Sequence, residues 1–308
     1  MRAPRAFLET AQDAIDLLVS PLTHKRGARV KDHRPWPAPA RSWVMAQSWM
    51  DLLFAHWTVS PEALQRAVPR SLELQTFEGQ AWIGVTPFEV RNLRLRAMLP
   101  IPGLSNFPEI NVRTYVSFGG KPGIYFLSLD AGSAFAVAAA RAFYRLPYFN
   151  AHMAIEREAD ELRYTSERKA SENAPAAAFR GQYRPRGIVR PPAAGTLEHW
   201  LTERYCLYTF DDQRRVLRGE IHHPPWPLQS AEADIALNTM GNELGIELSG
   251  TPLLHYAARQ DVVFWTLERA TGTSSDPTHL DCAGTDAGSD AHPALLRGRR
   301  IGRRRRQR

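Results

Sequence analysis

The sequence predicts an α+β fold that is rich in antiparallel strands and built round a curved or closed sheet. Short apolar runs of strand length recur along the chain, separated by turns that contain glycine, proline or acidic residues. Only a few segments carry the apolar spacing of three and four residues that is typical of a helix. The chain has 308 residues, of which 44% are hydrophobic, so it can bury a large core.

The N-terminal segment 1–40 is expected to form a helix and a linker. Apolar residues at spacings of three and four form one face of a helix over Phe7–Val19. Four prolines and interspersed charges follow between residues 21 and 40, which predicts a linker laid along the surface. The apolar face of the helix needs a surface to cover it, either on this protein or on a partner.

The segment 41–268 is expected to form one β-rich domain. Trp49–Trp57 is a dense apolar and aromatic run, short enough for a buried strand. Ser60 can cap a short helix that begins at Pro61 and ends before Pro69. Two antiparallel strand pairs follow, with strands at Leu72–Phe77, Ala81–Val90, Ile110–Phe118 and Ile124–Asp130.

The second half of this domain mixes helices and strands. Asp130 or Ser133 can cap an alanine-rich helix that runs to about Tyr144. A hairpin is expected over residues 152–167, with its turn at residues 159 and 160. The remaining expected elements are a helix start near Thr196 that passes into a strand by Phe210, a helix at Leu228–Met240 and a strand at Val262–Leu267.

The net charge of +7 is concentrated in the C-terminal segment 269–308. Residues 297–308 hold eight arginines and no acid, and without them 31 basic side chains face 32 acidic ones. Like-charge runs are normally solvated and disordered, so we expect an arginine-rich disordered tail and no specific nucleic-acid partner. Non-specific binding of a polyanion through Arg297–Arg308 is an alternative role for the tail.

The most informative segment for function is the expected strand that follows Phe107. Side chains alternate between the two faces of a strand, so every second residue from position 109 shares one face. That polar face consists of Glu109, Asn111, Arg113 and Tyr115. One interpretation is a half-solvated strand whose charged groups pair in water. The other is a polar pocket inside a closed sheet, where Glu and Arg would shift each other's ionisation.

Several longer motifs occur in order over most of the chain. They are DLLFAHW (51–57), FEGQAWIGVTPF (77–88), FPEINVRTYV (107–116), GIYFLSLDAGS (123–133), AARAFYRLPY (139–148), LTERYCLY (201–208) and HHPPWPLQ (222–229). In these motifs the chain resembles the YqjF-like family of uncharacterised bacterial proteins, which is distantly similar to acetoacetate decarboxylase. The resemblance implies a cone-like, antiparallel closed barrel with an internal ligand cavity and a few flanking helices.

The similarity to acetoacetate decarboxylase also implies where its chemistry would lie. In that enzyme a strand carries a Glu, and a helix with an Arg leads into a Pro-Lys-Lys motif that supplies a Schiff-base lysine. Glu109, Arg141 and Pro147 match the first three of these residues. Tyr148 and Phe149 stand where the lysines would be, and neither can form an imine. Schiff-base decarboxylation is not expected, because the lysines of the chain all lie in segments that read as exposed: Lys25, Lys31, Lys121 and Lys169.

Two classes of function follow for the cavity. An enzyme would use Glu109 and Tyr148 as catalytic residues, with Glu109 as the acid or base for a small organic acid. The residues expected to bind its anionic group are Arg113, Arg141, Tyr115 and Asn111. This chemistry needs no cofactor. The alternative is a non-catalytic ligand-binding or sensing module, which has no need of a lysine.

No motif predicts a metal, a nucleotide or a membrane span. His222 and His223 are adjacent, so they point to opposite faces of a strand and are expected to be structural. Cys206 is expected to be an inert buried thiol. The longest apolar run, residues 134–140, is far shorter than the roughly 20 residues of a membrane-spanning helix. Acidic residues in the first helix argue against a signal peptide, so a cytoplasmic protein is expected.

Overall fold

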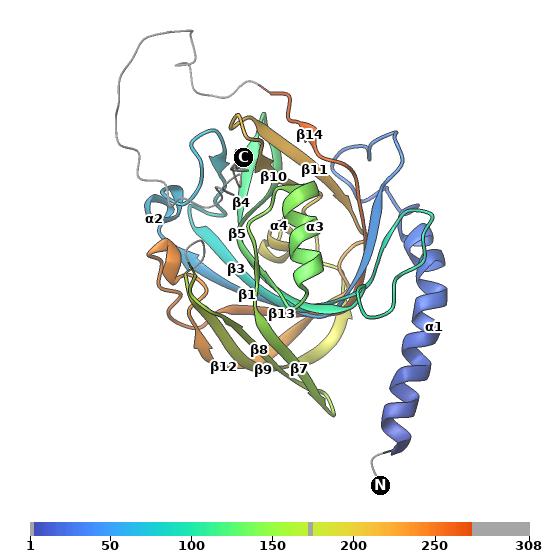
Figure 1. Cartoon of the computed structure of the whole chain (residues 1–308). Coiled ribbons are helices and arrows are strands. Elements are labelled where there is room, and N and C mark those ends of the chain that lie inside the picture. Colours follow the sequence, from blue (N-terminus) through green and yellow to red (C-terminus); the bar gives the residue numbers. More distant parts are fainter. Residues whose placement is uncertain (1–2, 172–174, 273–308) are drawn as a thin grey trace, which may run out of the picture.

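Strand pairing dominates residues 3–171 and 175–272, the part of the chain that the computed structural model describes (Figure 1). The helices are α1 (Ala3–Gly27), α2 (Pro61–Gln65), α3 (Ala134–Tyr144), α4 (Leu197–Thr202) and the 3-10 helix η1 (Asn242–Leu244). The strands are β1 (Met45–Val59), β2 (Glu73–Leu74), β3 (Ala81–Leu95), β4 (Phe107–Phe118), β5 (Lys121–Ala131), β6 (Tyr148–Asn150), β7 (His152–Glu158), β8 (Glu161–Arg168), β9 (Ala177–Arg190), β10 (Cys206–Phe210), β11 (Val216–His222), β12 (Leu228–Asn238), β13 (Leu253–Phe264) and β14 (Glu268–Arg269). The fold is therefore a sheet-rich α+β fold, as predicted.

All of these strands belong to one sheet. Neighbouring strands follow the order β14-β11-β10-β5-β4-β3-β1-β13-β12-β9-β8-β7, while β2 pairs with β4 and β6 pairs with β5. β11 also pairs with β13, through Ile221 and Phe264. The pairings β11-β10-β5-β4-β3-β1-β13 thus return to β11, and we call these strands the strand ring. The strands β12, β9, β8 and β7 continue beyond β13 and form the sheet extension.

The main hydrophobic core lies between the strand ring and the sheet extension. Ile110 and Val112 of β4 are fully buried in this core, together with Tyr164 of β8 and Phe179 of β9. Because side chains alternate along a strand, the neighbours of Ile110 and Val112 on β4 point to the opposite face. The main core therefore occupies one face of β4, and the side chains on the opposite face of β4 do not pack into this core.

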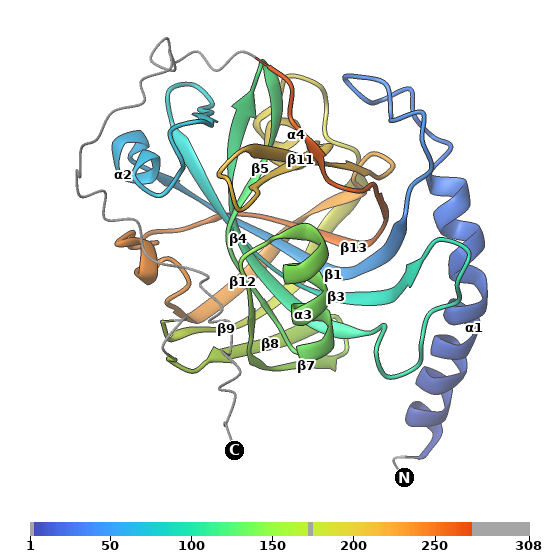
Figure 2. The same ribbon diagram turned by 45° about the horizontal axis from the view of Figure 1, so that its top comes forward.

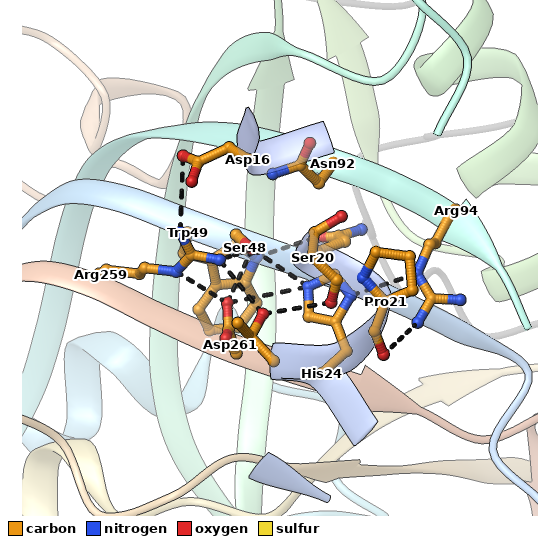
Figure 3. A network of polar contacts seen from close by, with 12 residues as sticks. Asp16, Ser20, Pro21, His24, Ser48, Trp49, Asn92, Arg94, Arg259 and Asp261 are labelled. Atoms are coloured by element: carbon orange, nitrogen blue, oxygen red, sulfur yellow. Dashed lines mark hydrogen bonds and ion pairs between the residues drawn. The ribbon is translucent and has the colours of Figure 1, made fainter. Parts of the chain in front are cut away.

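Helix α1 lies along the outside of the sheet (Figures 1 and 2). Figure 3 shows the polar network that holds it there. His24 Nε2 lies 3.0 Å from Ser48 Oγ on β1, and Arg94 Nε of β3 donates to His24 Nδ1 at 3.3 Å. An ion pair joins Arg259 Nη1 of β13 to Asp16 at 3.6 Å. The N-terminal helix is thus docked on its own protein.

Helix α1 is longer than predicted, and the linker after it is anchored. The helix continues through Pro21 to Gly27 instead of ending at Val19. Arg34, in the predicted linker, forms a buried ion pair with Glu220 at 2.9 Å.

Within the described residues, no helix combines the length and the apolar character needed to cross a membrane.

Local capping signals were predicted correctly. Ser60 caps α2 by accepting a hydrogen bond from the backbone N–H of Ala63. Ser133 caps α3 in the same way by accepting from Ala136, and α3 ends at Tyr144 as expected. The hairpin of β7 and β8 also has the predicted register, with Glu158 paired to Glu161.

The predicted helix at Leu228–Met240 is wrong, because Leu228–Asn238 forms strand β12. This strand pairs with β9 and β13. Its residues Ala231, Ala233 and Ile235 pack against the main core at a spacing of two, which is the period of a strand. The helix-forming alanines, glutamate and leucine of this segment gave a helical propensity that pairing with β9 overrides.

Some strands and one pairing of the sheet were not predicted. Strands β9 and β11 had no counterpart in the sequence prediction, and β10 pairs with β5 in parallel. Strand β14 (Glu268–Arg269) crosses the predicted boundary at residue 268 and pairs with β11. Most of the predicted arginine-rich tail, from residue 273 onward, lies outside the described residues.

Candidate functional site

A cavity of about 500 Å³ is walled by the strand ring and by α3. Each strand of the ring contributes at least one lining residue, and most of the wall is apolar. The polar side chains that reach it include Thr86, Glu109, Asn111, Arg113, Tyr148, Arg204 and His223. An apolar cavity of this size with a few convergent polar groups is typical of a small-molecule site.

Strand β4 supplies the polar row that the sequence indicated. Glu109, Asn111 and Arg113 all line the cavity, and each is only 5% exposed. Ile110 and Val112, which alternate with them, are fully buried in the main core on the other face. The row is therefore not the half-solvated surface of an ordinary strand.

Glu109 is mostly protonated at pH 7. Burial raises the pKa of its carboxyl from 4.5 to about 8, although the hydrogen bond from Tyr148 acts in the opposite direction. Tyr148 Oη donates that bond to Glu109 Oε2 at 3.0 Å, and Tyr164 Oη donates to the backbone oxygen of Glu109 at 2.7 Å. Burial also raises the pKa of Tyr148 well above its usual value, so this phenol keeps its proton.

Arg113 is a buried cation that lacks a carboxylate partner among the described residues. Its guanidinium carbon lies 5.0 Å from the ring centroid of Phe54. Its Nε and Nη2 atoms have no hydrogen-bond partner in the described part of the chain. Among the described residues Arg113 and Glu109 form no ion pair, and burial rather than Arg113 raises the pKa of Glu109. A buried guanidinium without a carboxylate partner lowers the free energy of unfolding unless an anion compensates its charge.

Arg204 is a second buried cation in the cavity wall, and sequence reasoning missed it. It lies between α4 and β10, where its Nε donates to the backbone oxygen of Trp200 at 2.7 Å. Its Nη1 donates to Gln75 Oε1 at 2.6 Å, while its Nη2 has no partner among the described residues. Burial lowers the pKa of Arg204 to about 10, so it stays charged at pH 7. The signal available in the sequence was its place in the motif LTERYCLY (201–208).

Tyr115 lies behind the cavity wall and supports the two arginines. It is fully buried and is not a lining residue, contrary to its predicted role in direct ligand binding. Its hydroxyl lies 2.7 Å from His56 Nε2, and its ring packs 4.7 Å from the ring of Trp200. The guanidinium of Arg204 stacks over Tyr115 at 5.1 Å. Tyr115 therefore orients Arg204.

Two neutral polar groups next to the arginines also lack partners. Asn111 Oδ1 and Thr86 Oγ1 are buried in the cavity wall without a hydrogen-bond partner in the described part of the chain. Buried polar atoms normally have partners, so such a group needs an explanation. The unpaired atoms of Arg113, Arg204, Asn111 and Thr86 all belong to residues that line one cavity.

Arg141 does not reach the cavity. It is exposed on α3, where its Nε donates to the backbone oxygen of Tyr148 at 2.6 Å. Its guanidinium lies 5.6 Å from the ring of Phe149. Arg141 thus fixes the chain between α3 and β6, whereas Glu109, Tyr148, Asn111 and Arg113 from the predicted set meet at the cavity.

The other candidate residues have structural contacts. His223 is buried, and its two ring nitrogens lie 2.7 Å and 3.3 Å from the backbone oxygens of Pro224 and Arg204. His222 Nε2 lies 3.2 Å from the backbone oxygen of Gly27. The described residues contain no cluster of three His, Cys, Asp or Glu side chains that could hold a metal. None of the residues lining the cavity, all within the described ranges, is a lysine.

Solved structures with a similar fold include a biosynthetic enzyme and an acetoacetate decarboxylase-like enzyme. One is the enduracididine biosynthesis enzyme MppR complexed with pyruvate, with a TM-score of 0.54 and 14% identity over 78% of this chain and 94% of that one. Another is an acetoacetate decarboxylase-like enzyme from Sphingomonas wittichii, with a TM-score of 0.54 and 12% identity over 77% of this chain and 99% of that one. At this level of identity the likeness concerns the fold.

The sequence itself matches a family and a bacterial relative. The uncharacterized protein YqjF of Bacillus subtilis is 49% identical over 232 residues, which are 75% of this chain and 94% of the relative. A family model described as an uncharacterized conserved protein, DUF2071, matches residues 46–261, which include the strand ring up to β13. The chain therefore belongs to the DUF2071 family of uncharacterized conserved proteins.

Proposed function

We propose that this protein binds a small organic acid in the cavity and that the strand ring is a closed, cone-like barrel around it. The continuous pairing from β11 round to β13 supports the closed barrel. Arg113 carries the proposal for the ligand, because its buried guanidinium faces the cavity without a carboxylate partner among the described residues. A ligand carboxylate would supply that partner through charge-assisted hydrogen bonds.

The charge balance of the cavity also favours an anion. Glu109 is mostly protonated at pH 7, because burial raises its pKa to about 8, so it does not cancel the charge of Arg113. Arg204 adds a second positive charge, since its lowered pKa of about 10 still lies above 7. Asn111 and Thr86 add neutral groups that can hydrogen-bond to the ligand.

Glu109 gives this site the means for acid–base chemistry without a cofactor. A carboxyl with a pKa of about 8 populates both protonation states near neutral pH, as a general acid or base requires. On a 2-oxo acid, ionised Glu109 would take a proton from the carbon next to the keto group, and protonated Glu109 would return one to it. Tyr148 would hold the carboxyl in place. The fold neighbour that is complexed with pyruvate supports a 2-oxo acid as the first ligand to test.

A non-catalytic binding module is the second candidate. The absence of lysine from the residues that line the cavity favours it, because a Schiff-base step needs a primary amine. Proton exchange at C3 of 2-oxohexanoate in D2O, followed by NMR, distinguishes the two. An enzyme exchanges these protons and loses the activity in Glu109→Gln, whereas a binding module leaves them unexchanged.

Calorimetric titration with 2-oxo and 2-hydroxy acids tests the binding itself. We expect at least one acid to bind, and we expect Arg113→Met to weaken its binding by at least about tenfold, since hydrogen bonds to charged groups contribute roughly 1.5–3 kcal/mol. The variant should fold, because the substitution removes an uncompensated buried charge.

Arg180→Met is the matched control, because it removes an exposed arginine of β9 that does not line the cavity and should leave the affinity unchanged. If no acid binds at millimolar concentration, or if Arg113→Met binds as well as the wild type, the proposed function is wrong.

A further inference from the structure

The cavity opens to solvent through an unusually apolar mouth. Seven large apolar side chains both line the cavity and are exposed by 39% or more. Five of them lie in or next to the segment between β3 and β4, and two lie on α3: Leu95, Met98, Leu99, Ile101, Leu104, Phe135 and Phe143. A contiguous exposed apolar patch of this kind usually marks a binding site.

The two cavity arginines whose nitrogens lack partners among the described residues come from other elements than these exposed apolar side chains. Arg113 and Arg204 are each only 5% exposed, whereas Leu99 and Phe143 at the mouth are 59% and 76% exposed. The wall also contains buried apolar side chains, including Phe88, Phe107 and Leu129. Within the described part of the chain, the cavity therefore combines two buried arginines with unpaired nitrogens, a buried apolar wall and an exposed apolar mouth.

The volume of the cavity sets the size of the molecule that fills it. A cavity of about 500 Å³ is many times larger than the roughly 30 Å³ that one water molecule occupies in the liquid. A three-carbon acid such as pyruvate would occupy only the part next to the arginines. The remaining apolar wall calls for an apolar chain.

We infer that the ligand is an amphipathic acid, with a carboxylate at Arg113 and Arg204 and an apolar chain long enough to reach the mouth at Leu99 and Phe143. This inference rests on the proposed function and adds the class of ligand to it. An apolar chain in this position would cover the apolar wall from the arginines to the mouth. A partner that touched only the mouth from outside would leave the buried part of that wall uncovered.

Calorimetric titration with hexanoate and dodecanoate tests the inference. Each methylene buried in the cavity should tighten binding roughly fourfold. Because part of the longer chain lies at the exposed mouth, we expect dodecanoate to bind at least about 100-fold more tightly than hexanoate. Dodecanol, which has the same chain and no carboxylate, should bind at least about tenfold more weakly than dodecanoate.

Substitutions at the mouth separate the chain from the carboxylate. Leu99→Glu and Phe143→Glu should weaken dodecanoate at least about tenfold and leave hexanoate within twofold, because both side chains are exposed and contact only the outer chain. Ile188→Glu on β9 is the control, since Ile188 is 65% exposed and does not line the cavity. It should leave both affinities unchanged.

The outcomes distinguish this inference from the proposed function. Equal affinity for hexanoate and dodecanoate would overturn the long chain and leave acid binding intact. Failure of both acids, with the 2-oxo acids also failing, would remove the proposed function and the inference together. If Leu99→Glu releases the protein from phosphatidylglycerol vesicles and leaves the dodecanoate affinity unchanged, the mouth is a membrane contact and the inference is overturned.

Discussion

Glu109 and Arg113 share one face of β4, and burial affects the two side chains in opposite ways. For Glu109, burial removes the charge, because the protonated carboxyl needs no counter-ion. A guanidinium cannot lose its proton in this way, so Arg113 keeps its charge and its need for an anion. The two residues therefore give the cavity a net positive charge without forming an ion pair. That asymmetry is the basis of the proposed acid binding.

The raised pKa of Glu109 predicts how stability depends on pH. The carboxyl titrates near 4.5 in the unfolded chain and near 8 in the folded protein. Between these values the folded state holds the extra proton, so the free energy of unfolding falls as pH rises, by up to about 1.4 kcal/mol per pH unit. Glu109→Gln keeps an acceptor for Tyr148 and removes this titration.

Urea unfolding at pH 5.5 and pH 7.5 checks this prediction. The difference in free energy of unfolding between Glu109→Gln and the wild type is compared at the two pH values. From pH 5.5 to pH 7.5 this difference should shift in favour of the variant by about 2 kcal/mol. Other buried groups, such as Asp130 and His24, are present in both proteins and cancel in the difference. Parallel pH profiles would show that Glu109 titrates as an ordinary exposed carboxyl.

Secondary structure was predictable wherever the signal is local. The caps of α2 and α3 depend on one serine and the next three residues. Ser60 was predicted for α2, and Ser133 was one of two candidates for α3. Strand β12 was mistaken for a helix, because its pairing with β9 lies outside any sequence window. Arg204 was missed for a related reason. It joins Arg113 in the cavity wall from a position about 90 residues away, and its place in the motif LTERYCLY does not show that it reaches the cavity.

Helix α3 depends on its N-cap and forms part of the cavity mouth. Ser133 Oγ accepts from the backbone N–H of Ala136 at 3.3 Å, so Ser133→Ala should lower the free energy of unfolding by about 1 kcal/mol. Ser133→Asp should restore it, because Asp is an equally good cap. Urea unfolding gives the comparison, with Ser42→Ala at an exposed position as the control. Equal stability of the two alanine variants would mean that the cap contributes nothing.

Across the whole molecule, the two faces of the strand ring divide stability from binding. The outer face packs Ile110 and Val112 against the sheet extension and forms the main core. The inner face can therefore carry Glu109, Asn111 and Arg113, whose desolvation costs free energy, while the core maintains the fold. The resemblance to acetoacetate decarboxylase implied a cavity of this kind. The replacement of Arg141 by Arg204 as its second cation was apparent only from the structure.

The most direct measurement is a crystal structure of the protein with bound dodecanoate, or with hexanoate if that acid binds more tightly. The carboxylate should lie about 2.7–2.9 Å from the unpaired nitrogens of Arg113 and within reach of Arg204, with its chain directed to the mouth. A carboxylate in bulk solvent, or an acid bound elsewhere while Arg113 pairs with a carboxylate of the protein, would contradict acid binding in this cavity.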